Sequence, residues 1–189
     1  MNNVAAAQVG ARASEAMGFL VDAVQQIPSE SWDQPSNLDG WSIRDLVVHT
    51  TGSAAKIVTL AEGGEVGQAP PEPDDPLAQL PNLAARLKDA LAGADLNALR
   101  PSPRGEVPLH QALRFPIFGL TIHAWDVYRS QHRPVEVPED LLAFCRQVVE
   151  SVPEDELRRP GLFGPAQPVP EDATPTTRLM AYVGRWVDG

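Results

Sequence analysis

Apolar residues recur at three- and four-residue steps through most of the chain, a spacing that gathers them on one face of an α-helix. The first such stripe ends at Pro28 and includes Val9, Ala13 and Met17. Proline and glycine interrupt the pattern between segments, as is typical of connections between helices. The pattern predicts five helices and a shorter sixth, over residues 4–27, 42–62, 77–92, 109–131, 139–152 and 176–186.

No series of alternating polar and apolar residues predicts a sheet, so the predicted fold class is all-α, an antiparallel helical bundle. The whole chain, residues 1–189, is interpreted as one domain because its length suits a single core. The tail over residues 153–189 is rich in proline but carries apolar residues, among them Leu162, Phe163 and Trp186. A free linker would not need them, so we expect the tail to pack on the bundle.

Proline occurs inside two of the predicted helices, 77–92 and 109–131, and in the acidic connection of residues 65–77 that precedes the first of them. A proline inside a helix removes one backbone N–H donor and crowds the preceding turn. Pro81 is therefore expected to shift the start of its helix, and Pro116 to kink or restart the next one.

The helix that starts near Ser42 has the most complete set of start signals. The hydroxyl of Ser42 can accept a backbone N–H of the first turn, which makes it a good N-cap. Asp45 lies three residues on, so its carboxylate can reach back to the cap and meets the positive end of the helix dipole. Trp41 and Leu46 are spaced for a hydrophobic staple. His49 follows about two turns into the helix, so this start fixes its direction.

Charge and composition exclude several classes of partner and location. The chain has 15 basic and 25 acidic residues, a net charge of −10, and no dense Lys/Arg cluster. Sequence-independent binding to nucleic acid or to an anionic membrane needs such a cluster, so we expect neither. No apolar run approaches the ~20 residues of a spanning helix, and residues 1–27 lack the pattern of a signal peptide. The single Cys145 excludes an intramolecular disulfide, which suits a cytoplasmic protein.

Two histidines on separate helices form the candidate site. His49 lies on the flank of the apolar face of its helix, and His123 precedes Asp126 by three residues on another helix. Imidazole and carboxylate groups together suit zinc or another first-row metal, with an open position for catalysis. The alternative is that each histidine is a buried residue satisfied by a neighbour, with Asp126 paired to Arg129 at helical spacing.

Other reactive side chains have ordinary explanations. His110 and His132 lie at helix ends, where capping or solvent exposure is expected. Cys145 lies in an apolar stripe, which favours core packing over a reactive thiolate. Ser53 is one turn from His49, a spacing that arises often by chance. No nucleophile elbow, phosphate loop or dinucleotide fingerprint is present, so no catalytic residue is assigned.

Three stretches of the sequence resemble one protein family. Residues 40–49, GWSIRDLVVH, resemble the G-W-[ST]-x-x-D-L-x-x-H opening of the mycothiol-dependent maleylpyruvate isomerase-like proteins, within the DinB-like superfamily. Residues 122–127, IHAWDV, resemble the H-x-W-D-L segment of an actinobacterial branch of that group, and residues 160–173 are similar to the tail of the same branch. The resemblance implies a DinB-like antiparallel four-helix bundle with additional C-terminal helical segments.

The resemblance also implies a metal site. In the family it is built by the histidines that match His49 and His123, and by an acidic residue or histidine four residues before the latter. This sequence has Gly119 at that position, so one ligand is missing and Asp126 remains as a candidate third ligand. The implied cofactors are zinc or another divalent metal, held weakly, and mycothiol.

Two functions follow from the residues and the resemblance together. The first is a metal-binding protein that transfers or isomerises a small electrophile with a thiol such as mycothiol, whose pKa the metal would lower. The second is a non-enzymatic bundle with a degenerate metal site, which binds a small-molecule ligand or forms a homodimer. Gly119 favours the second.

Overall fold

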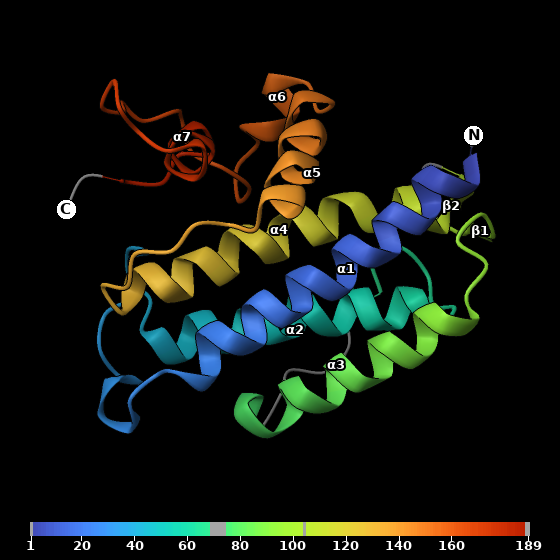
Figure 1. Cartoon of the computed structure of the whole chain (residues 1–189), viewed down its shortest axis with the longest axis horizontal. Helices are drawn as coiled ribbons and strands as arrows, with labels where there is room; N and C mark the ends of the chain where they lie inside the picture. Colours follow the sequence, from blue (N-terminus) through green and yellow to red (C-terminus); the bar gives the residue numbers. More distant parts are fainter. Residues whose placement is uncertain (1, 69–74, 104, 188–189) are drawn as a thin grey trace. The chain divides into compact units, whose positions relative to one another are not determined.

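The structure, a computed structural model, describes residues 2–68, 75–103 and 105–187 and is mostly helical (Figure 1). The predicted all-α class is confirmed. The contacts divide the chain into two compact units, one up to Val135 and one from Glu136. The second unit thus begins before the predicted tail and includes the helix expected over residues 139–152. Packing of the tail on the bundle stays a prediction, and residues 69–74 of the acidic connection lie outside the described residues.

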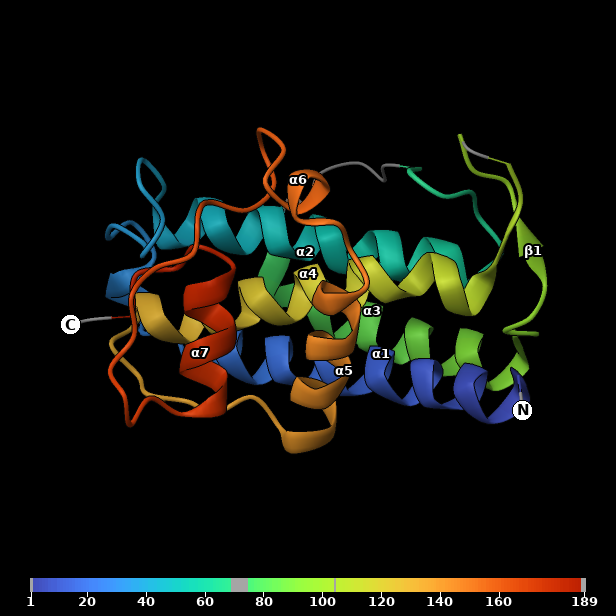
Figure 2. The ribbon, with the colours of Figure 1, turned by 90° about the horizontal axis from the view of Figure 1, so that it is seen from above.

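The first unit is a four-helix bundle in which each helix packs against two neighbours (Figure 2). α4 lies against α1 and α2, and α3 lies against the same two helices. The helices are α1 (Asn2–Gln25), α2 (Ile43–Ala61), α3 (Pro76–Gly93) and α4 (Leu109–Ser130).

The helices of the bundle alternate in direction only in part. α1 and α4 run in one direction, and α2 and α3 run in the other (Figure 2). The contacts agree, because the side chain of Gln131 just after α4 donates to the carbonyl of Ala23 near the end of α1. The long connection between α2 and α3 allows these two to be parallel, whereas a short turn produces an antiparallel pair. Both site helices, α2 and α4, remain antiparallel to each other.

Neither internal proline breaks its helix. α3 starts at Pro76, with Asp75 accepting the N–H of Ala78 at 3.2 Å, and continues through Pro81. α4 is likewise one helix through Pro116. An interior proline costs about 3 kcal/mol. Burial of one large apolar side chain returns about 1.5–3 kcal/mol, and α4 fully buries several around the proline, including Leu113, Ile117 and Phe118.

Short elements in the first unit were not predicted. β1 (Leu99–Arg100) pairs antiparallel with β2 (Val107–Pro108) just before α4. A 3₁₀ helix, η1 (Ser29–Ser31), follows α1. Two- and three-residue elements are too short to show a period in the sequence.

The second unit contains α5 (Glu139–Glu150), α6 (Glu154–Leu157) and α7 (Pro175–Tyr182). Its ends are tied together where the N–H of Val137 donates to Thr176 Oγ1 at 3.0 Å. α7 ends before the predicted Trp186, because Gly184 takes a φ of +86° and lies against the backbone of Gly164. Among the helices described, none is both long and apolar enough to cross a bilayer.

Candidate functional site

The start of α2 that positions His49 has the predicted capping box. Ser42 Oγ accepts the N–H of Asp45 at 3.1 Å, and Asp45 Oδ2 accepts the N–H of Ser42 at 2.9 Å. The hydrogen bonds from Ser42, with a smaller contribution from Arg44, lower the pKa of Asp45. Trp41, expected only as a staple, lies edge-on to the ring of His49 with centroids 5.0 Å apart. The same short segment therefore fixes the helix start and one wall of the site.

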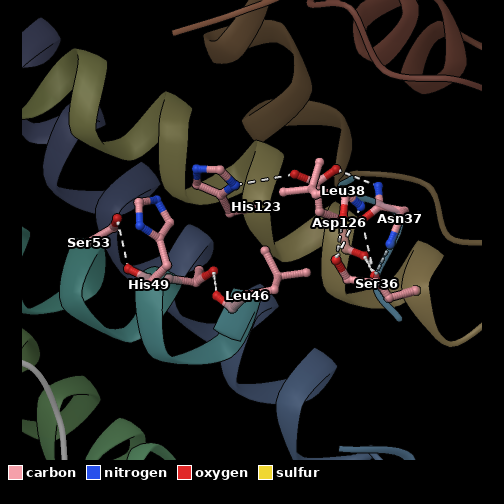
Figure 3. Close-up of polar contacts among 10 residues, drawn as sticks. Ser36, Asn37, Leu38, Leu46, His49, Ser53, His123 and Asp126 are labelled. Atoms are coloured by element: carbon pink, nitrogen blue, oxygen red, sulfur yellow. Dashed lines mark hydrogen bonds and ion pairs between the residues drawn. The ribbon is translucent and has the colours of Figure 1, made fainter. Parts of the chain in front are cut away.

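The structure brings His49 and His123 together from facing helices. Their ring centroids are 4.9 Å apart and the ring planes are nearly perpendicular, at 87° (Figure 3). His49 is exposed, and 20 % of the His123 side chain is accessible. Partial burial lowers the pKa of His49, and the positive charges of His123 and Lys56 add to the effect. The pair is thus accessible, with His49 favoured in its neutral form.

Asp126 lies behind His123 and is fully buried. Its Oδ2 is 3.2 Å from Nδ1 of His123, and its Oδ1 accepts the side-chain amide of Asn37 at 2.8 Å (Figure 3). Both carboxylate oxygens are therefore engaged. Asp126 thus contacts a histidine on its own helix, a pairing that neither the metal-ligand interpretation nor the Arg129 alternative named.

The donor set does not fit a resident metal ion with three protein ligands. Two imidazoles that share a tetrahedral zinc have ring centroids about 5 Å apart, so the spacing of His49 and His123 suits two ligands. Asp126 occupies Nδ1 of His123, so an ion would meet the opposite nitrogen, away from the carboxylate. Gly119 offers no side chain. In the part of the chain that the structure describes, no group of three His, Cys, Asp or Glu side chains could hold a metal.

The remaining candidates lie apart from this pair. His110 Nδ1 is 2.9 Å from the carbonyl of Leu96, and His132 is exposed after the end of α4. Cys145 is buried, as its stripe predicted. The hydroxyl of Ser53 donates to the backbone carbonyl of His49, as helical serines do, and is not paired with the ring.

Sequence reasoning missed Asn37. The residue is half-buried in the connection between η1 and α2 and meets a side chain 89 residues away. Asparagine is common in turns, so its presence in this turn-rich segment needed no further explanation. No local pattern in the sequence marks a residue whose partner is distant along the chain.

The sequence matches the family model of the mycothiol maleylpyruvate isomerase N-terminal domain over residues 13–128. The chain belongs to this family. The match runs from α1 to the last part of α4, so it includes both histidines, Gly119 and Asp126. The resemblance stated from the motifs around His49 and His123 is thereby confirmed, whereas residues 160–173 lie outside the match. Comparison with curated proteins and with solved structures gives no match.

Proposed function

We propose that this chain binds a small thiol of the mycothiol kind between His49 and His123, and that His123 accepts the thiol proton. The family description names mycothiol, and the matched residues contain both histidines. The observation that carries the proposal is the accessible ring of His123, supported by a buried carboxylate on one side and facing His49 on the other. No resident metal ion is part of the proposal, since the residues that the structure describes supply no third ligand.

The chemistry of the pair suits an S–H group. A neutral imidazole whose Nδ1 donates to a carboxylate has a lone pair on the opposite nitrogen, and can take a proton there. The carboxylate of Asp126 then stabilises the imidazolium that forms, and the thiol is left as a thiolate. The lowered pKa of His49 favours its neutral form at pH 7, so a second positive charge does not oppose protonation of His123.

A cavity in the same bundle, lined by both polar and apolar side chains, offers room for the rest of a ligand. It has a volume of 520 Å³ and is lined by residues from the ends of α1 and α4 and the start of α2, including Gln26, Gln34, Ser36, Ser130 and Arg133. Ile43 also lines it, six residues before His49 on α2, or about 9 Å along the helix axis. Amide and hydroxyl groups suit the polar part of a small thiol that carries its own hydroxyls.

A metal-dependent form of the same function is the second candidate, and the ring separation is what supports it. Spacing of 4.9 Å suits two imidazoles on one ion. A third ligand would then come from the bound thiol. Zinc binding that appears only together with the thiol would favour this candidate.

Calorimetric titration with mycothiol tests the proposal. Protein treated with chelator is expected to bind one equivalent, His123→Ala to lose binding, and His110→Gln to keep it. His110 is the matched control because its ring pairs with a backbone carbonyl away from the pair. Equal binding by His123→Ala and the natural protein would refute the proposed site.

Adding an electrophile separates enzyme from binding protein. Maleylpyruvate is added together with the thiol, and the rate at which its thiol adduct or its isomer forms is measured. If this rate is higher with the natural protein than with His123→Ala, the chain is an enzyme. Thiol binding without any acceleration identifies the non-enzymatic alternative. Light scattering at the same concentrations measures whether the ligand-bound chain is a homodimer.

A further inference from the structure

Asn37 connects the segment before α2 to the interior of the bundle. Its side-chain amide donates to Oδ1 of Asp126, whose other oxygen faces Nδ1 of His123 (Figure 3). We propose that Asn37 is a positioning residue for His123. By holding the Asp126 carboxylate, it keeps the hydrogen of the neutral ring on Nδ1 and leaves Nε2 open to a ligand. The inference rests on the proposed function in one respect, which is that His123 accepts the proton of the thiol.

The burial of Asp126 gives Asn37 and His123 a role in stabilising its carboxylate. A carboxylate removed from water is stable only when hydrogen bonds replace its hydration. The ionised group has no hydrogen to give, so each neighbour must donate. Nδ1 of His123 must then carry the hydrogen, because the hydrogen bond made by one ring nitrogen decides which tautomer is present.

Ser130 and Asp126 both contact the side chain of Asn37. The backbone N–H of Asn37 donates to Ser130 Oγ at 3.0 Å, and that hydroxyl lies 3.0 Å from Oδ1 of Asn37. The hydroxyl is also 2.8 Å from the backbone carbonyl of Asp126, so its single hydrogen serves one acceptor at a time. A flipped amide would place the oxygen of Asn37 against the carboxylate of Asp126. The orientation that gives Nδ2 to Asp126 is therefore the one the carboxylate requires.

An exchange of the two side chains provides a sharp test. Asp126→Asn alone puts an amide N–H₂ against the N–H₂ of Asn37, or an N–H₂ against the N–H of His123. The first orientation brings two donors together, and the second does so unless the ring moves its hydrogen to Nε2, so the single variant should populate both tautomers. Adding Asn37→Asp replaces the opposing donor with an acceptor, so the introduced amide can accept from Nδ1 of His123 and donate to the introduced carboxylate. The double variant should restore the pattern that the single variant breaks.

The tautomer is read from the ¹⁵N resonances of His123 in labelled full-length protein at about pH 8, where an ordinary histidine is neutral. The natural protein is expected to show a dominant Nδ1–H form. Asn37→Ala and Asp126→Asn should give a mixture of tautomers, and the double variant should return the Nδ1–H form. Ser36→Ala is the matched control, because its hydroxyl is hydrogen-bonded to the backbone of Leu38 in the same segment, and its loss should leave the resonances unchanged.

Several results would overturn the inference. One is that the tautomer of His123 is unchanged in Asn37→Ala. Another is that the spectrum of the double variant is no closer to the natural one than that of Asp126→Asn. A third is that Ser36→Ala changes the His123 resonances as much as Asn37→Ala does. If Asp126→Asn does not fold, Asn37→Ala and the double variant still decide the question. The measurement contains no thiol. A fixed tautomer with no mycothiol binding would therefore refute the proposed function and leave the role of Asn37 standing.

Discussion

At the scale of single residues, the site depends on one buried charge. The effective penalty for burying a carboxylate is several kcal/mol, and a hydrogen bond to a charged group returns about 1.5–3 kcal/mol. Asn37 and His123 each provide such a bond to Asp126. Loss of either bond should lower the free energy of unfolding, and the ring of His123 is held by a carboxylate that is itself held in the interior.

His49 gives a pH dependence at this scale. Partial burial lowers its pKa below the ordinary 6.5, so the unfolded chain binds a proton more readily than the folded one. The contribution of His49 to the free energy of unfolding should be complete at a pH above 6.5, the ordinary pKa of the unfolded chain. It should be lost as the pH falls through the lower pKa of the folded chain. Urea unfolding of the natural protein and of His49→Gln checks this. Identical pH profiles for the two would contradict it.

At the scale of elements, α2 is fixed at its start by residues that are close in sequence. Ser42→Ala removes the cap hydroxyl and should lower the free energy of unfolding by about 1 kcal/mol. The control is Ser53→Ala, in the interior of the same helix, which should change it by less than about 0.5 kcal/mol. Urea titration measures both. An unchanged midpoint for Ser42→Ala would count against the contribution of the cap.

Gly119 on α4 supplies the second prediction at this scale. An acidic side chain one turn before His123 could meet the same ion, with His49 arriving from α2. A Cβ at position 119 meets no atom within 4 Å, so the substitution has room. Gly119→Glu should tighten zinc binding by about tenfold or more, since it completes a three-ligand set. Loss of an interior glycine also favours the helix by up to ~1 kcal/mol.

Zinc calorimetry on the natural protein and on two variants decides this. The gain should disappear when Gly119→Glu is combined with His49→Ala. The natural protein should hold zinc weakly or below one equivalent. Tight one-to-one binding by the natural protein would mean that another residue already completes the site.

At the scale of the whole molecule, the two units set the expected effect of truncation. α5 and α7 pack in the second unit, and α5 buries an apolar stripe that includes Leu141, Cys145 and Val148. A chain that ends at Val152 keeps this stripe but loses α6 and α7, so it should aggregate. A chain that ends at Val135 lacks the stripe and should remain a helical bundle. Circular dichroism and light scattering compare them, and equal solubility would refute the expectation.

Net charge also acts at this scale. A charge of −10 without a dense basic cluster repels polyanions, so the chain should not bind duplex DNA at physiological salt. Fluorescence anisotropy with a labelled duplex is the measurement. Binding below about 1 μM that weakens with salt would show a basic surface that the sequence does not reveal.

The sequence by itself determined the features that depend on neighbours along the chain. The helical stripes followed from the 3.6-residue period, and the cap at Ser42 from partners three residues apart. The motif around His49 and the motif around His123 identified the family, which the match over residues 13–128 confirms. Cys145 in the core followed from its stripe alone.

Only the tertiary structure decided what depends on partners distant in sequence. Burial outweighed the cost of Pro81 and Pro116, so both helices continue through proline. The helical spacing was compatible with Asp126 as a metal ligand and equally with Asp126 as a partner of Arg129. Packing brings Asn37 and His123 against the carboxylate in the interior, where an unpaired charge is unstable. Contacts of this kind leave no period or local motif, so no single stretch of sequence contains them.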